Sequence, residues 1–309
     1  QLLLPLAISF FTFQQITFLV DAYRRVSVEY NFVDYVVFVS FFPQLIAGPI
    51  VHHREMMPQF ESTDTKTLRY EHLSVGLVIF VGGLFKKLMI ADRLSLLANR
   101  GFDESASLDL VEAWATSLSY TCQLYYDFSG YCDMAIGAAL MFNIKLPLNF
   151  NAPYKATDIQ DFWRRWHITL GRFLRDYVYI PLGGSRRRDA KVCANLLAVF
   201  LIGGLWHGAG WLFILWGLLH GVAAVANRLW KGLGVALPTW LAWLLTFNFV
   251  NIAWVFFRAK EFPDAIKVLS GMAGLNGVAP PRFLHKYGEL LDLDLPLASP
   301  GELGFSGWG

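Results

Sequence analysis

Long apolar windows, separated by short polar stretches, run along most of the chain. Residues 1–20 and 232–257 carry no charged side chain. A membrane-crossing helix needs roughly 20 mostly apolar residues, so each of these windows predicts one span. The window 192–227 also lacks a formal charge and is too long for one perpendicular helix. It predicts two spans, or one span and a re-entrant segment.

Two further apolar windows contain a few charged residues. Residues 113–144 include only Asp127 and Asp133, whereas residues 73–98 are interrupted by four charges. Taken together, the windows predict roughly six to eight membrane segments. The expected fold class is therefore all-α, a polytopic membrane protein.

The segment Thr157–Tyr177 has a different, amphipathic pattern. At about 100° per residue, its large apolar side chains fall within an arc of roughly 120° and most of its charged ones lie opposite. Thr157 and Gln160 have the spacing of a capping box, so the pattern predicts one helix over the whole segment. A helix with aromatic residues on one face and arginines on the other is typical of a membrane interface or of a groove between spans.

The composition agrees with a membrane protein, since 55% of the residues are hydrophobic and only 16% are charged. The mean hydropathy is +0.41. A net charge of +2 gives no indication of nucleic-acid binding. The basic residues concentrate between positions 164 and 191, which favours a cytoplasmic location for that segment.

The chain divides most simply into one membrane domain, residues 1–275, and a polar tail or loop, residues 276–309. The first residue, Gln1, already lies within an apolar run, so we expect the N-terminus to be truncated. We likewise expect the polar tail to lead to further C-terminal spans.

The strongest candidate for chemistry is His207, which lies near the middle of an apolar run between Gly204 and Gly208. An ionisable residue at such a place is rare, because its charged form costs roughly 2.5–3.5 kcal/mol at the bilayer centre. Four glycines, Gly203, Gly204, Gly208 and Gly210, leave room for backbone or ligand, and Trp206 and Trp211 offer walls and indole donors. A neutral imidazole there can act as a general base. The alternative is a packed structural histidine.

Other ionisable residues fit structural roles better. His220, in the same window, is read as bonding to a neighbouring helix, and His52 and His53 as an interfacial loop. Asp127 and Asp133 are functional candidates because intramembrane carboxylates usually are, although a structural role is favoured. No phosphate loop, zinc motif or nucleophile elbow occurs, so no metal and no bound cofactor are expected.

Several motifs together resemble the membrane-bound O-acyltransferase (MBOAT) family, and most of all its alginate O-acetyltransferase branch. The resemblance extends from Pro5 to about Lys260. It rests on the stretches Ile8–Gln14, Phe42–Ile50, Tyr126–Tyr131, Asp161–His167, Tyr179–Gly184 and Leu205–Gly208.

The resemblance implies a helical core with a tunnel, in which an acyl group passes from a cytoplasmic thioester to an acceptor reached from the other face. His207 matches the family's catalytic histidine, and His167 matches the second motif position. A histidine at that second position is similar to the bacterial polysaccharide and teichoic acid enzymes. It implies a bacterial inner-membrane protein with a cell-surface acceptor.

We therefore expect an O-acyltransferase in which His207 is the base and His167 positions the acyl carbonyl or relays the proton. Acetyl-CoA or an acylated carrier protein is the expected donor, and a polysaccharide such as alginate the acceptor. A periplasmic SGNH-type acetyltransferase is the expected partner, beside the lipid bilayer. The residues expected to bind substrate are Trp163, Arg164, Arg165, Trp206 and Asp127. Arg172 is a third arginine that could attract the phosphates of the donor.

Three alternatives remain open from the sequence. The same fold transfers D-alanine to teichoic acid in other branches of the family. Asp127, Asp133 and His207 would suit a proton relay in a transporter. The third alternative is a scaffold that only assembles a complex for polysaccharide export.

Overall fold

The computed structural model describes residues 8–25, 32–44, 48–186 and 188–278, with side chains from residue 11 onward. Every regular element in these ranges is helical. The α-helices are α1 (Ile8–Tyr23), α2 (Phe32–Ser40), α3 (His53–Glu61), α4 (Tyr70–Phe85), α5 (Asp92–Asn99), α6 (Leu110–Met141), α7 (Ile159–Arg165), α8 (Ile168–Leu174), α9 (Asp189–His207), α10 (Trp211–Gly232), α11 (Thr239–Arg258) and α12 (Phe262–Met272).

Shorter helical segments link them. Three are π-helical, η3 (Lys86–Ala91), η4 (Arg100–Glu104) and η6 (Arg175–Tyr179), and three are 3-10 turns, η1 (Phe42–Gln44), η2 (Thr63–Lys66) and η5 (Pro153–Lys155). The all-α prediction is confirmed. The predicted tail, residues 276–309, lies almost wholly outside the described residues.

Four helical stretches in the described ranges are long and apolar enough to cross a membrane: Tyr70–Glu104, Asp189–His207, Trp211–Gly232 and Thr239–Arg258. The long window 192–227 indeed holds two helices, α9 and α10. The predicted six to eight segments also counted the windows of α1 and α6. Within the described residues α1 covers 16 residues, and α6 intersperses its apolar residues with many polar ones.

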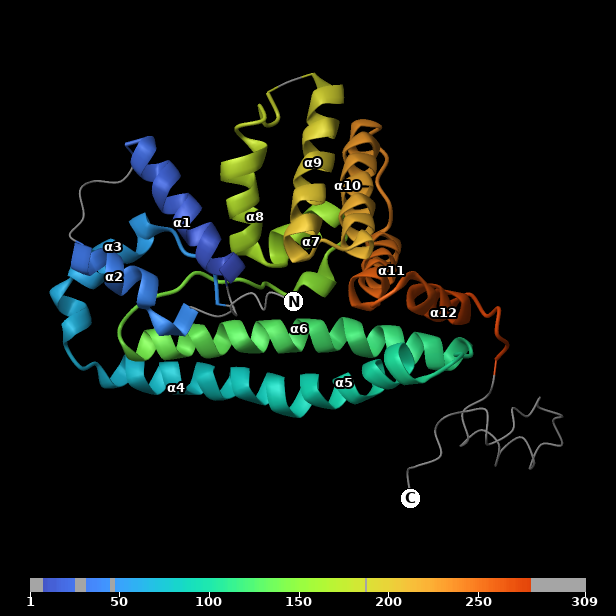
Figure 1. Ribbon diagram of the computed structural model, residues 1–309, viewed down its shortest axis with the longest axis horizontal. Helices are drawn as coiled ribbons and strands as arrows, with labels where there is room; N and C mark the ends of the chain where they lie inside the picture. The colour runs from blue at the N-terminus through green and yellow to red at the C-terminus, as the bar shows by residue number, and fades with distance from the viewer. Residues whose placement is uncertain (1–7, 26–31, 45–47, 187, 279–309) are drawn as a thin grey trace.

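The longest helix, α6, lies against α4 and α5 in one layer (Figure 1). Glycines let the two backbones approach: a Cβ on Gly83 would lie 2.5 Å from the carbonyl oxygen of Gly130, and one on Gly76 would lie 2.7 Å from that of Gly137. Small residues at helix contacts are the usual means of close packing in membranes. We call this contact the α4–α6 seam.

A second group of helices, α7 to α10, lies on one side of this layer (Figure 1). Here α9 and α10 run side by side, and Gly204 and Gly217 face the backbone of the opposite helix. Between the groups, aromatic side chains from α7, α10 and α11 form a buried core that includes Phe162, Trp216 and Trp254. This core fixes α7 against α10.

The predicted single helix Thr157–Tyr177 is wrong, because the chain breaks at His167. The φ and ψ angles of His167 are 43° and 53°, a left-handed conformation that separates α7 from α8. The predicted capping box is also wrong, since Asp158, and not Thr157, caps α7 by accepting a hydrogen bond from the backbone of Asp161. A tertiary contact, described below, overrides the local helical pattern.

Candidate functional site

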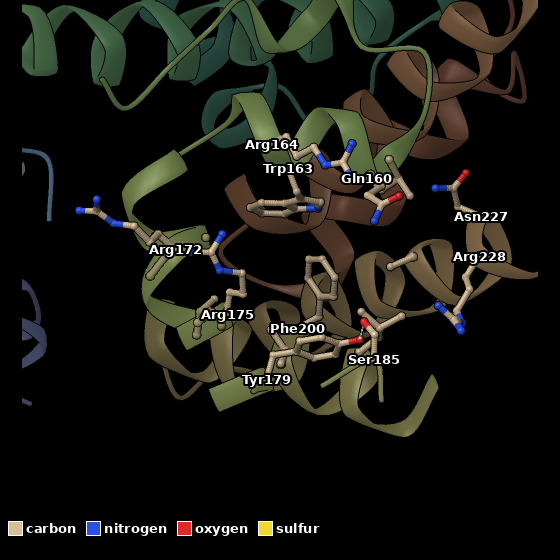
Figure 2. A pocket seen from close by; sticks show the side chains of 18 of the residues that line it. Gln160, Trp163, Arg164, Arg172, Arg175, Tyr179, Ser185, Phe200, Asn227 and Arg228 are labelled. Carbon is tan, nitrogen blue, oxygen red and sulfur yellow. Dashed lines mark hydrogen bonds between the residues drawn. The ribbon is translucent and has the colours of Figure 1, made fainter. Parts of the chain in front are cut away.

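A cavity of about 1040 Å³ lies between α7, α8, η6, α9 and α10 (Figure 2). Trp163, Phe200 and Trp216 give it aromatic walls, and His207 contributes its imidazole. Polar side chains from α7, α8, η6 and the loop after it, α9 and α10 also line it; they are Gln160, Arg164, Arg172, Arg175, Tyr179, Ser185, Asp189, Asn227, Arg228 and Lys231. Figure 2 shows Gln160 and Asn227 on the same side of the cavity, with Arg228 beside them. The cavity is thus apolar near His207 and rich in cations elsewhere.

His207 is the last residue of α9 and is half-buried. Aromatic rings surround its imidazole, with centroid distances of 4.6 Å to Trp206, 4.9 Å to Phe257 and 5.2 Å to Trp216. Within the described residues, no carboxylate or other polar side chain forms a hydrogen bond with it. Apolar surroundings favour the neutral form of an imidazole, and the neutral form can accept a proton from a group in the cavity.

The glycines near His207 have different roles. Gly203 lines the cavity, whereas Gly204 lies against the backbone of Phe213 in α10. The Trp206 ring packs against the imidazole of His207, but Trp206 is not among the residues that line the cavity. Trp211 is 75% exposed and does not line the cavity either.

His167 is buried at the break between α7 and α8. Its Nδ1 lies 3.2 Å from Oδ1 of Asn149, and the edge of the Phe128 ring meets it at a centroid distance of 4.8 Å. Trp206 lies within reach of both histidines, 6.3 Å from His167 between ring centroids. Burial lowers the pKa of His167, and the nearby His207 lowers it further. His167 is therefore neutral at physiological pH.

His220 has the structural contacts expected of it. The side chain is fully buried, and its Nδ1 accepts a hydrogen bond of 3.2 Å from the indole of Trp163 on α7. Trp163 in turn lines the cavity. His220 thus holds a cavity wall in place from a neighbouring helix.

The three candidate arginines differ in their partners. Arg165 is paired with Asp161 at 2.9 Å, and Arg172 forms a bidentate pair with Glu55 at 2.6 and 3.0 Å. Arg164 is exposed at the cavity, and no carboxylate among the described residues pairs with it. Of the three, Arg164 is the one available to bind an anionic ligand.

Asp127 and Asp133 lie outside the cavity, at the α4–α6 seam. Asp127 pairs with Lys87 at 2.8 Å, and Asp133 with Lys86 at 2.5 Å. Both lysines belong to the π-helical segment η3. This arrangement agrees with the structural role favoured for the two carboxylates, and it separates Asp127 from the other predicted substrate-binding residues.

The interfacial loop expected at His52 and His53 is wrong. Both side chains are about 1% exposed, at the start of α3. His52 Nδ1 lies 3.3 Å from the hydroxyl of Tyr177, which donates to the buried carboxylate of Asp21 at 2.8 Å. The adjoining apolar residues hide the pair from solvent, so burial lowers the pKa of both histidines.

Sequence reasoning missed Asn149 and the polar residues of α10 that line the cavity. Asn149 stands before Pro153 in a stretch that reads as an ordinary turn. Asn227 and Arg228 lie at the end of an apolar window. Nothing in the sequence indicates that this end of α10 lies near α7 in the fold. A polar residue at the edge of an apolar window was the only signal.

Comparison with known proteins gives consistent matches. The family model described as MBOAT, membrane-bound O-acyltransferase family, matches residues 1–262. A peptidoglycan O-acetyltransferase of Helicobacter pylori is 57% identical over 90% of this chain and 58% of its own length. A probable alginate O-acetylase, AlgI, of Pseudomonas aeruginosa is 41% identical over 88% of this chain and 52% of its own length.

More distantly, a teichoic acid D-alanyltransferase of Bacillus subtilis is 28% identical over 83% of this chain and 69% of its own length. The chain spans between half and three-fifths of the length of the two acetyltransferase relatives. The expected resemblance to the alginate branch is confirmed, and the Helicobacter relative is more similar still.

Proposed function

Because this chain belongs to the membrane-bound O-acyltransferase family, we propose that it transfers acetyl groups from a cytoplasmic thioester towards hydroxyl groups of an extracytoplasmic polysaccharide. The observation that carries the proposal is the position of His207, whose imidazole lines a large cavity among aromatic rings. The names of the relatives support O-acyl transfer.

The proposed reaction has one covalent step. The acceptor hydroxyl attacks the thioester carbonyl, a carbon–oxygen bond forms and the carbon–sulfur bond breaks. His207 takes the hydroxyl proton as general base, a role worth about 10²- to 10⁴-fold in rate, and returns it to the leaving thiolate. Backbone amides and the Trp206 indole near His207 are candidate donors to the developing oxyanion.

The donor is a thioester such as acetyl-CoA or an acylated carrier protein, both of which carry phosphate. Arg164 supports this choice, since it lies at the cavity without a carboxylate partner in the described part of the chain. An arginine binds phosphate well because its guanidinium offers two parallel donors. Arg165 and Arg172 are engaged in ion pairs and are weaker candidates.

For the acceptor, the identities favour peptidoglycan over alginate, with 57% against 41% in the two relatives so named. Acetyl groups that cross the membrane would pass to a periplasmic acetyltransferase of the SGNH type, and the protein would lie in the inner membrane. D-alanyl transfer to teichoic acid is the alternative, which the 28% identity of that relative makes weaker.

The test uses the complete protein in a bacterial host and compares His207→Ala with His72→Ala. His72 is matched because it is a half-buried histidine on α4, away from the cavity, that contacts Asn143. We expect ester-linked acetate on purified peptidoglycan to disappear with His207→Ala and to persist with His72→Ala, at equal protein levels.

Other outcomes would replace the proposal. Acetate that is lost from an extracellular polysaccharide instead would identify a different acceptor, and loss of ester-linked D-alanine would favour the alternative donor. Unchanged acetate in His207→Ala would contradict the acyl-transfer role of His207. Polysaccharide flux that persists without acyl transfer would favour a transporter or scaffold.

A further inference from the structure

We propose that Asn149 is a positioning residue, which holds His167 in the tautomer with its proton on Nδ1, so that Nε2 is the nitrogen that accepts a proton during transfer. The inference rests on the proposed function for its mechanistic meaning. Its structural part, the tautomer of His167, can be tested without any activity.

The orientation of the Asn149 amide is fixed by a donor that cannot be reversed. The backbone N–H of Thr169 points at Oδ1 of Asn149 at 3.1 Å, and the Thr169 hydroxyl lies 2.9 Å from the same atom. A backbone N–H is only a donor, so the atom facing it is the amide oxygen. The amide nitrogen then points to Sγ of Cys132, at 3.2 Å.

The same Oδ1 faces Nδ1 of His167 at 3.2 Å. A carbonyl oxygen accepts and does not donate, so Nδ1 must carry the proton. In a neutral imidazole the other nitrogen then has the lone pair. The burial of His167, which disfavours the charged ring, keeps it in this neutral form.

Asn149 also holds the backbone at the break. Its main-chain carbonyl accepts from the N–H of Ile168 at 3.0 Å, while its side chain takes the N–H of Thr169. These two contacts replace helical hydrogen bonds just where His167 adopts its left-handed conformation. Such a conformation costs roughly 1–3 kcal/mol and persists only where the surroundings enforce it. One buried residue, 1% exposed, thus sets both the backbone and the ring of His167.

The tautomer distinguishes between the two roles considered for His167. A lone pair on Nε2 cannot donate to an acyl carbonyl oxygen, but it can accept a hydrogen bond from the acceptor hydroxyl or relay a proton. The indole of Trp206 packs against both imidazoles, with ring centroids 6.3 Å from His167 and 4.6 Å from His207. His167 therefore accepts a hydrogen bond or relays the single proton that His207 takes from the hydroxyl, and the oxyanion must be stabilised by other groups.

The first test observes the tautomer directly. The complete protein, labelled with ¹⁵N-histidine and reconstituted in lipid, would be studied by solid-state NMR, with His167→Gln to assign the signal. A proton on Nδ1 alone is the expected result. A proton on Nε2, or on both nitrogens at neutral pH, would overturn the inference even if the protein transfers acetyl groups normally.

The second test uses Asn149→Asp and the pH dependence of acetyl transfer by the complete, purified protein. A carboxylate beside Nδ1 keeps the acceptor but stabilises the imidazolium, so it raises the pKa of His167. We expect the acidic limb of the rate profile to move to higher pH by about one unit or more. Asn149→Ala, which removes the acceptor, should reduce the rate about 10- to 100-fold, as the loss of a residue that orients a functional histidine typically does.

Thr169→Val is the matched control. This substitution removes the Thr169 hydroxyl that donates to Asn149 but leaves the contact between the Asn149 amide and His167. It should therefore not move the acidic limb, whatever its effect on the rate. An acidic limb that stays in place in Asn149→Asp would contradict the inference. If the unaltered protein transfers no acetyl group, the proposed function fails, and the NMR result still decides the tautomer.

Discussion

The α4–α6 seam and the cavity beside α9 both contain ionisable residues within apolar stretches of sequence. The contacts of these residues differ between the two regions. At the seam, Lys86 and Lys87 lie within 2.5–2.8 Å of Asp133 and Asp127. At the cavity, His207 faces aromatic rings and open space. An ionisable residue in an apolar window is therefore not by itself a sign of chemistry, and what it contacts decides its role.

The largest expected effect concerns transfer activity. We expect His207→Gln to reduce acetyl transfer at least 100-fold, because the general base is lost. Asp127→Asn should keep it within about threefold, since Asp127 pairs with Lys87 away from the cavity. Transfer from radiolabelled acetyl-CoA by the complete protein measures both. If Asp127→Asn greatly reduced acetyl transfer while His207→Gln did not, the chemistry would lie at the seam and not at the cavity. That result would support the predicted substrate-binding role of Asp127.

The second prediction tests the packing at the seam. In Gly83→Val the new side chain would meet the backbone of α6, because a Cβ there lies 2.5 Å from the Gly130 oxygen. We expect a loss of about 1–3 kcal/mol in stability. Gly82→Val is the matched control, since nothing lies within 4 Å of a Cβ at the adjacent position. When thermal unfolding of the complete protein is measured in detergent, only Gly83→Val should show a lower Tm.

The third prediction tests the ion pairs at the seam. Asp133→Ala leaves Lys86 without its partner and should lower stability by roughly 1–2 kcal/mol, a modest value because both side chains are about one-third exposed. The double exchange Lys86→Asp with Asp133→Lys should recover part of the loss, whereas Lys86→Asp alone should not. If all three variants had the same Tm as the unaltered protein, the pair would contribute nothing to the stability of the fold.

The sequence predicts the helical fold and singles out His207 as a candidate, because both inferences depend on local patterns. The length of the window 192–227 predicts two helices, and His207 is an ionisable residue between glycines in that window. The break at His167 could not be predicted in this way. It depends on Asn149, which contacts His167 and Thr169 from 18 and 20 positions away.

The separation of the arginines has the same cause. Arg164 and Arg165 are adjacent in sequence and look equivalent, but Asp161 lies one helical turn before Arg165 and pairs with it. That pairing follows the i, i+4 rule and was open to prediction. The pairing of Arg172 with Glu55 was not, because it joins residues 117 positions apart.

The smallest expected effect is a pH dependence of stability that comes from the buried histidines near α3. Burial lowers the pKa of His53 in the folded protein from an ordinary value near 6.5. The unfolded chain therefore binds more protons as the pH falls, so stability is greatest above about pH 6.5 and declines below it. His53→Gln should flatten the decline of Tm between pH 7 and 5, even if it lowers the Tm at pH 7. Gln59→Ala, at a hydrogen-bonding residue of the same helix that does not titrate, is the control and should leave the slope unchanged. An unaltered slope in His53→Gln would mean that the pKa of His53 is the same in the folded and unfolded states, which would contradict the prediction.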